Sequence, residues 1–154
     1  MNHENYPDAY LRDILENART IAVVGASPRR DRPSHRVMAY LQRHGYRAIP
    51  VNPNAAGGII NGEHCYDALA EIAEPIDIVD IFRRSEKAGA AVDDAIAAGA
   101  KVVWMQLGVR DEAAAARAAA AGLKVVMNRC PAIEIPRLGL PPRRTAGSSA
   151  ELSD

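Results

Sequence analysis

Small, hydroxyl-bearing and cationic residues cluster in segment 25–34, directly after the first apolar run of the chain. The β-branched run at residues 20–25 is typical of a buried strand, and a helix is expected to begin with Ser34 as its N-cap. A glycine lets backbone approach a phosphate, and a helix N-terminus offers free N–H groups and partial positive charge. Either this segment binds an anion, for which a nucleotide pyrophosphate is the natural candidate, or it is a tight turn with a solvated basic loop. The residues concerned are Gly25, Ala26, Ser27, Arg29, Arg30, Arg32 and Ser34.

Two common nucleotide-binding motifs are absent. The dinucleotide pattern G-x-G-x-x-G requires glycine where this chain has Ser27 and Arg30. The second predicted strand ends in Asn52-Pro53, without the carboxylate that holds the ribose diol of NAD. No G-x-x-x-x-G-K-S/T segment is present either. NAD and a P-loop ATPase are therefore disfavoured, whereas a ribose that carries a phosphate would not need the missing carboxylate.

The ends of the later strands offer further candidate residues. Asn52-Pro53 is either a stiff wall beside an adenine or an ordinary loop terminator. Arg83, which follows Phe82, could clamp a phosphate bidentately or pair with a carboxylate at the start of the next helix. Gln106 comes after another buried strand, where a polar side chain would help to bind a ligand.

No set of residues indicates catalysis. Cys130 follows the last predicted strand, beside Asn128, and a neighbouring arginine could lower the pKa of its thiol. A nucleophilic cysteine needs a base, however, and no histidine can be assigned to that role, so a structural thiol is favoured. Asp77 and Asp80 point to opposite faces of one strand and form no acid/base pair. Asp80, inside a buried strand, is expected to cap a backbone group or to meet a cation.

These candidates need a fold that brings strand ends together. Short apolar runs alternate with amphipathic stretches, which is typical of βαβ units and a parallel sheet. We expect one Rossmann-like α/β domain over residues 1–140, a doubly wound sheet of about five parallel strands in three α/β/α layers. Residues 141–154 are predicted to be a flexible tail. Strands are expected at 20–25, 46–51, 76–82, 101–105 and 123–127, and helices at 8–18, 33–44, 85–98 and 111–121.

Composition narrows the function classes. Lys plus Arg and Asp plus Glu are 19 each, so no net field attracts nucleic acid or an anionic membrane. The apolar runs are too short to span a bilayer, and the first residues do not resemble a secretory signal. We therefore expect a cytoplasmic protein with reduced cysteines. The alanine-rich run at 111–121 could cover the sheet or pack on another chain, so a homo-oligomer or a partner enzyme stays open.

The strand-end motifs together resemble a known family. In order they are VVGAS, HGY-x-x-x-PVNP, DIVDIFR, VVWMQLGV and NRCPAIE. Over residues 8–140 the chain resembles the small bacterial CoA-binding proteins, which are similar to the CoA-binding domain of the succinyl-CoA synthetase α subunit. The resemblance implies a Rossmann-like domain that holds the 3′-phospho-ADP part of coenzyme A across the strand ends. It implies pyrophosphate contacts at Gly25, Ala26, Ser27 and Ser34, adenine contacts at Asn52 and Pro53, a pantetheine or phosphate path at Phe82 and Arg83, and the thiol-bearing end at Gln106, Asn128 and Cys130.

One departure from the family concerns the 3′-phosphate. Relatives often carry lysine just after the NP turn, where this chain has Asn54-Ala55, so either Arg30 or Arg32 substitutes or the phosphate is held less well. In the synthetases a phosphorylated histidine comes from a separate ligase domain, which we do not expect the residues after Leu140 to supply, so the resemblance implies no ligase activity. The expected function is a non-catalytic CoA or acyl-CoA binding protein, a carrier, sensor or regulatory module. The alternatives are an NAD(P)-dependent oxidoreductase with a degenerate fingerprint and a ligase or transferase fragment that needs a partner chain.

Overall fold

A parallel sheet forms the centre of the molecule. In the computed structural model, which describes residues 1–143, five parallel strands lie in the order β2-β1-β5-β6-β7. The central strand, β5, pairs with β1 from Ile78 with Ile21 to Ile81 with Val24. This confirms the predicted fold class. The strands are β1 (Thr20–Val24), β2 (Arg47–Val51), β5 (Ile78–Ile81), β6 (Val102–Met105) and β7 (Lys124–Val126).

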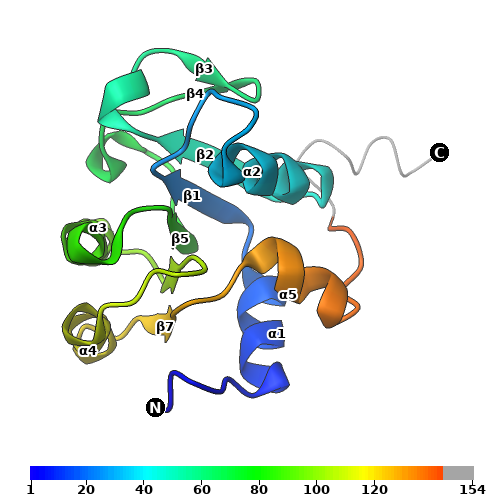
Figure 1. Cartoon of the computed structure of the whole chain (residues 1–154), viewed down its shortest axis with the longest axis vertical. Coiled ribbons are helices and arrows are strands. Elements are labelled where there is room, and N and C mark those ends of the chain that lie inside the picture. Colours follow the sequence, from blue (N-terminus) through cyan, green and yellow to red (C-terminus); the bar gives the residue numbers. More distant parts are fainter. Residues whose placement is uncertain (144–154) are drawn as a thin grey trace.

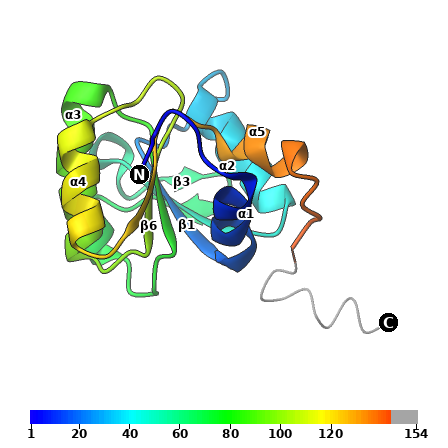
Figure 2. The same ribbon diagram turned by 90° about the horizontal axis from the view of Figure 1, so that it is seen from below.

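Helices cover both faces of the sheet and complete three layers (Figures 1 and 2). One face carries α1 (Asp8–Asn17), α2 (Pro33–Arg43) and α5 (Pro131–Arg137), and the other carries α3 (Ser85–Ala97) and α4 (Glu112–Ala120). Each face buries its own apolar cluster against the strands. The chain therefore winds in both directions from β1, which leaves a crevice at the carboxyl ends of β1 and β5.

The alanine-rich helices cover the sheet. In α4, Ala114, Ala115 and Ala118 are buried in the same apolar cluster as the inward side chains of α3. Asp111 is the N-cap of α4, and its side chain accepts a hydrogen bond from the Ala114 N–H at 3.0 Å. Alanine is the strongest helix former, and its small side chain lets the two helices approach the strands closely. This helix face is thus used within the chain.

Two regions differ from the expected pattern. The irregular stretch after β2 contains a small antiparallel hairpin, β3 (Ile59–Ile60) with β4 (Glu63–His64), flanked by the short helices η1 (Pro53–Ala55) and η2 (Leu69–Glu71). Helix α5 was not predicted, because its seven residues include Pro136 within the helix, and proline normally argues against a helix interior. It packs against α1 and α2 on the same face of the sheet, with Ile135 fully buried in the apolar cluster of that face.

The segment that follows α5 stays against the domain as far as it is described. Leu140 is buried, and the Arg143 N–H donates to the His44 carbonyl at 2.7 Å. The guanidinium of Arg143 also donates to the Leu15 carbonyl at 3.1 Å, at the end of α1. Within the predicted tail, Arg143 is therefore bonded to the domain while Pro141 and Pro142 are exposed, and the rest of that tail lies outside the described residues. None of the helices formed by residues 1–143 is both long and apolar enough to cross a membrane.

Candidate functional site

A cavity of about 560 Å³ lies where the carboxyl ends of β1, β2, β5 and β6 meet. This is the crevice that the doubly wound topology predicts. Its wall combines glycine backbone, hydroxyl groups, arginines and a few apolar side chains. The lining residues are Gly25, Ser27, Arg29, Arg32, Pro33, Ser34, Asn52, Phe82, Arg83, Arg84, Gln106, Leu107, Gly108 and Val109.

Gly25 is required by the sheet as well as by the cavity. Its φ of +88° lies in the left-handed region that side chains avoid, and a Cβ there would stand 2.2 Å from the Phe82 carbonyl oxygen. The close approach of these two strand ends explains the glycine without a ligand. A side chain at position 25 would distort the fold, so a Gly25 substitution cannot report on phosphate binding alone.

Four arginines surround the cavity, on the segments that enter α2 and α3. Arg29 pairs with Asp31 at 3.1 Å, and both side chains are exposed. Within residues 1–143, Arg32, Arg83 and Arg84 form no ion pair. The pairing of Arg83 with the following helix, expected as one alternative, is thus not made. Such uncompensated guanidinium groups favour a bound anion.

Both helix N-termini at the cavity are open. Arg32 and Arg84 occupy the N-cap positions of α2 and α3, and neither makes a side-chain capping hydrogen bond. The prediction that Ser34 caps α2 is wrong, because the helix begins at Pro33 and places Ser34 inside its first turn. Ser34 is largely buried, but it also lines the cavity. The free N–H groups of these first turns add positive potential on the same side as the arginines.

Asn52 joins two strand ends through its side chain. Its Nδ2 donates to the Ala26 carbonyl at 2.7 Å, and its Oδ1 accepts from the Asn54 N–H at 2.9 Å. The amide is therefore occupied within the protein and holds the loop after β1 against the loop after β2. NAD-binding domains have a carboxylate at this strand end, which holds the ribose diol. Asn52 occupies that place on the cavity wall, and its amide cannot hold a ribose diol in the same way.

The loop after β6 is held from two sides. The Gly108 N–H donates to Asn128 Oδ1 at 2.7 Å, while Ser85 Oγ donates to the Gly108 carbonyl at 3.3 Å. Asn128 has a φ of 58°, a left-handed conformation that asparagine tolerates better than most residues. Asn128 does not line the cavity, so it supports the cavity wall from behind.

Beneath the cavity lies a group of buried polar side chains. Asp80 is fully buried in β5, and neither carboxyl oxygen has a hydrogen-bond partner. The expectation that Asp80 caps a backbone group or meets a cation is therefore wrong. Burial raises the pKa of Asp80 well above its usual value, which favours an uncharged carboxyl. Gln106 is 7% exposed, and its Oε1 is also without a partner.

Cys130 belongs to this buried group and does not line the cavity. It is 5% exposed and precedes α5 as the N-cap residue. Burial raises the pKa of its thiol, although a hydrogen bond with the Gln106 side chain opposes the change. A raised pKa disfavours the thiolate that a nucleophile or a disulfide exchange requires. The interpretation as a structural thiol agrees with this environment.

The cavity gathers eight of the thirteen predicted site residues, while their roles in binding stay predictions. Arg84, Leu107 and Val109 also line it but were not predicted. Arg84 could have been inferred, since it stands immediately before a predicted helix. Leu107 and Val109 have apolar side chains, so nothing in the sequence marks them as site residues. They line the cavity because of the path that the loop after β6 takes. The eight are Gly25, Ser27, Arg32, Ser34, Asn52, Phe82, Arg83 and Gln106, and the other five are Ala26, Arg30, Pro53, Asn128 and Cys130.

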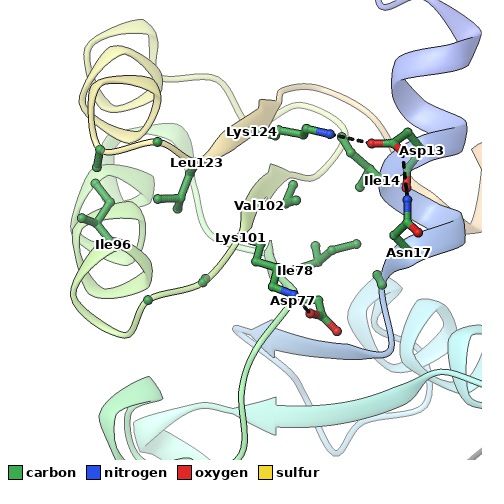
Figure 3. A pocket seen from close by; sticks show the side chains of 15 residues that line it. Asp13, Ile14, Asn17, Asp77, Ile78, Ile96, Lys101, Val102, Leu123 and Lys124 are labelled. Atoms are coloured by element: carbon green, nitrogen blue, oxygen red, sulfur yellow. Dashed lines mark hydrogen bonds and ion pairs between the residues drawn. The ribbon is translucent and has the colours of Figure 1, made fainter.

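A second cavity, of about 500 Å³, lies at the opposite, amino end of the sheet (Figure 3). Its two lysines are paired: Lys124 Nζ with Asp13 at 2.5 Å, and Lys101 Nζ with Asp77 at 3.4 Å. Its remaining wall is largely apolar, with Ile14, Ile78, Ile96, Val102 and Leu123. Residues 1–143 contain no group of three or more His, Cys, Asp or Glu side chains that could hold a metal ion.

Comparisons with known proteins identify the family. The CoA binding domain family matches residues 19–136. Over 127 residues, 82% of this chain and 93% of the relative, the sequence is 39% identical to the uncharacterized protein YneT of Bacillus subtilis (strain 168). The structure is similar to that of a hypothetical protein from Pyrococcus horikoshii OT3, with a TM-score of 0.83 and 38% identity, covering 90% of this chain and 96% of that one.

A larger enzyme contains a similar domain. The dinucleotide-forming acetyl-coenzyme A synthetase 1 of Ca. Korarchaeum cryptofilum matches with a TM-score of 0.63 and 25% identity, covering 74% of this chain and 26% of that chain. The match thus corresponds to about a quarter of the synthetase. The family match extends from β1 to α5 and includes every segment that lines the cavity. This chain belongs to the CoA binding domain family.

Proposed function

We propose that the chain binds coenzyme A in the cavity at the carboxyl ends of the strands and acts as a non-catalytic binding module. The observation that carries this proposal is the group of arginines beside two open helix N-termini. Arg32, Arg83 and Arg84 form no ion pair among residues 1–143. Coenzyme A carries a pyrophosphate and a 3′-phosphate, and several phosphates suit several guanidinium groups.

The arginines also offer a substitute for the missing lysine. Arg30 and Arg32 were equal candidates in the sequence, but only Arg32 lines the cavity. Arg32 stands at the N-cap of α2, beside the first-turn N–H groups that we assign to the pyrophosphate. We assign the 3′-phosphate contact to Arg32.

The proposal of a non-catalytic role rests on the polar groups below the cavity. The Cys130 thiol is buried with a raised pKa, and the carboxyl of Asp80 is fully enclosed. Neither group lines the cavity, and His35, the histidine nearest the start of α2 in sequence, does not line it either. Nucleophilic or general-base chemistry would need such a group within hydrogen-bond reach of the ligand. A carrier, sensor or regulatory module needs only the binding site.

Titration calorimetry of the reduced protein tests the proposal. CoA, dephospho-CoA, NAD and NADP would be titrated under identical conditions. We expect CoA to bind, dephospho-CoA to bind at least tenfold more weakly, and NAD not to bind, because the loss of a charge-assisted contact has about this cost. Binding of NAD or NADP without CoA would reject the proposal and favour an oxidoreductase.

Arg30 and Arg32 form a matched pair of variants. Both are exposed arginines of the same loop, but only Arg32 lines the cavity. Arg32→Met should weaken CoA binding about tenfold and remove the preference over dephospho-CoA, while Arg30→Met should change neither. Equal effects of the two variants would show that the loop acts through net charge and that the cavity contact is misassigned.

A further inference from the structure

Residues 1–7, which precede α1, cross the carboxyl end of β7 between α1 and α4 (Figure 1). Tyr6 anchors them, because its side chain is buried in the apolar cluster and its hydroxyl accepts a hydrogen bond from the Met127 N–H at 2.8 Å. This N–H directly follows the edge strand β7, beside which residues 1–143 place no further strand. Residues 3–6, which we call the N-terminal strap, are therefore part of the folded domain.

Glu4 ties the strap to two loops far away in the sequence. Its carboxylate pairs with the Arg110 guanidinium at 2.5 Å, and its backbone carbonyl accepts from the Arg129 guanidinium at 2.8 Å. The Arg129 guanidinium also lies over the ring of Tyr6, 5.1 Å from the ring centroid, in a cation–π contact. Arg110 follows the loop after β6, and Arg129 comes shortly after β7. A single residue thus links the segments that leave two neighbouring strands.

One of these segments forms a wall of the carboxyl-end cavity. Residues 106–109 line the cavity, and Arg110 is the next residue along the chain. Within this loop the Gly108 N–H donates to Asn128 Oδ1 at 2.7 Å, which connects the loop to the segment after β7. Residues 1–7 do not line the cavity themselves. Any effect of the strap on the shape of the cavity must therefore pass through the loop.

The Glu4–Arg110 pair is well placed to hold this loop without being needed for folding. Of the two side chains, 69% and 34% are exposed to solvent, and exposed ion pairs contribute little to the stability of a fold. The effect on a ligand is different. A loose loop loses conformational entropy when a ligand orders it, whereas a loop that is already held has less entropy to lose. Holding the loop therefore favours binding more than it favours folding.

We propose that Glu4 is a positioning residue of the ligand site, which acts through Arg110 to hold the loop after β6 in the arrangement that binds the ligand. This inference rests on the proposed function. The strap makes no contact with the ligand, so its contribution is the preorganisation of one cavity wall. By thermodynamic linkage, bound coenzyme A in turn stabilises the docked strap.

Calorimetry with CoA separates positioning from general electrostatics. For a polyanionic ligand, the loss of a nearby anion should strengthen binding and the loss of a nearby cation should weaken it. Positioning predicts instead that Glu4→Ala and Arg110→Ala each weaken CoA binding about threefold, because both substitutions break the same ion pair. The double variant should bind no more weakly than Arg110→Ala alone, since the pair is already lost. The sign of the change in Glu4→Ala therefore decides between the two explanations.

Asp8→Ala is the matched control. Asp8 pairs with Arg137 at 3.0 Å, and both side chains are exposed. Each of the two arginines also has a second carboxylate partner, Glu112 for Arg110 and Glu134 for Arg137. The control pair joins α1 to α5, and neither of its residues lines the cavity. Asp8→Ala changes the net charge as Glu4→Ala does and should leave CoA binding unchanged. Thermal melting would establish that each variant is folded.

Amide hydrogen exchange in the ligand-free protein tests the loop directly. By NMR the Gly108 N–H should exchange faster in Glu4→Ala than in the parent, and at the parent's rate in Asp8→Ala. Equal or tighter CoA binding by Glu4→Ala, or unchanged exchange at Gly108, would overturn the inference while CoA binding stood. Failure of the parent to bind CoA would reject the proposed function and the effect on affinity with it. The exchange rates would then decide alone whether Glu4 holds the loop.

Discussion

At the amino end of the sheet both lysines that line the cavity have aspartate partners, whereas at the carboxyl end Arg32, Arg83 and Arg84 have none among residues 1–143. The helix ends that border the two cavities also differ in the sign of their partial charge. The C-terminal ends of α3 and α4, with partial negative charge, border the amino-end cavity, and the N-terminal ends of α2 and α3 border the other. The two cavities have similar volumes, but among residues 1–143 only the one at the carboxyl end has cationic side chains without ion-pair partners. Only that cavity is therefore suited to a polyanion.

Two aspartates of one segment show the same contrast. Asp77, directly before β5, accepts hydrogen bonds from the Arg19 and Thr20 N–H groups at 2.8 and 3.0 Å. Burial raises its pKa, but these bonds and Lys101 outweigh burial, so the pKa lies below the usual value. Asp80, inside β5, has no partner, and burial raises its pKa. Asp77 therefore stabilises the fold as a carboxylate, while Asp80 is a buried group without a partner in β5.

Charge reversal at the two ends should have the largest effect. Arg32→Glu should weaken CoA binding at least a hundredfold, because it removes a cation and places an anion beside the phosphates. Lys101→Glu, which reverses an exposed charge at the amino-end cavity, should leave CoA binding unchanged in the same calorimetric titration. Comparable losses would show that general electrostatics govern binding and that the two cavities do not differ as described.

Stability should respond oppositely to loss of the two carboxylates. Asp77→Ala should lower the free energy of unfolding by about 2 kcal/mol, since two backbone N–H groups lose a charged acceptor. Asp80→Val should raise it by about 1 kcal/mol at neutral pH, because an unpartnered buried polar group is replaced by a side chain suited to a strand. Urea denaturation measures both. Destabilisation by Asp80→Val would mean that Asp80 has a partner in solution.

The advantage of Asp80→Val should depend on pH. The raised pKa means that folding favours the protonated form, so the parent loses stability as pH rises from about 4 through the pKa of Asp80 in the folded protein. The gap between Asp80→Val and the parent should therefore widen from pH 4.5 to pH 7.5. For Asp77 the pKa is lowered and its titration lies below that window. The cost of Asp77→Ala should stay nearly constant over the same range.

The smallest expected effect concerns the support behind the carboxyl-end cavity. Asn128→Gly keeps the left-handed backbone but removes the acceptor of the Gly108 N–H. We expect CoA binding to weaken about threefold, through a less ordered loop, and stability to change by less than about 1 kcal/mol. Unchanged affinity would show that the loop needs no support from Asn128.

Strong local patterns made most of the fold predictable. The short β-branched runs at 20–25 and 101–105 favour buried strands of a parallel sheet, and the alanine run at 111–121, closed by Gly122, favours a helix. Helix α5 escaped prediction because its two prolines outweigh its short apolar pattern. Strand ends also predicted the cavity, since parallel topology brings them to one edge of the sheet.

The sequence by itself determined the parallel sheet, the family and the candidates Gly25, Arg32 and Gln106, because periodicity and ordered motifs are local properties of the chain. The tertiary structure decided which candidates share a cavity. Arg30 and Arg32 are equivalent in sequence, and only the entry of the chain into α2 places one of them on the wall. Burial and pairing decided the rest, since the partners of Asp77 and the isolation of Asp80 depend on segments far apart in the sequence.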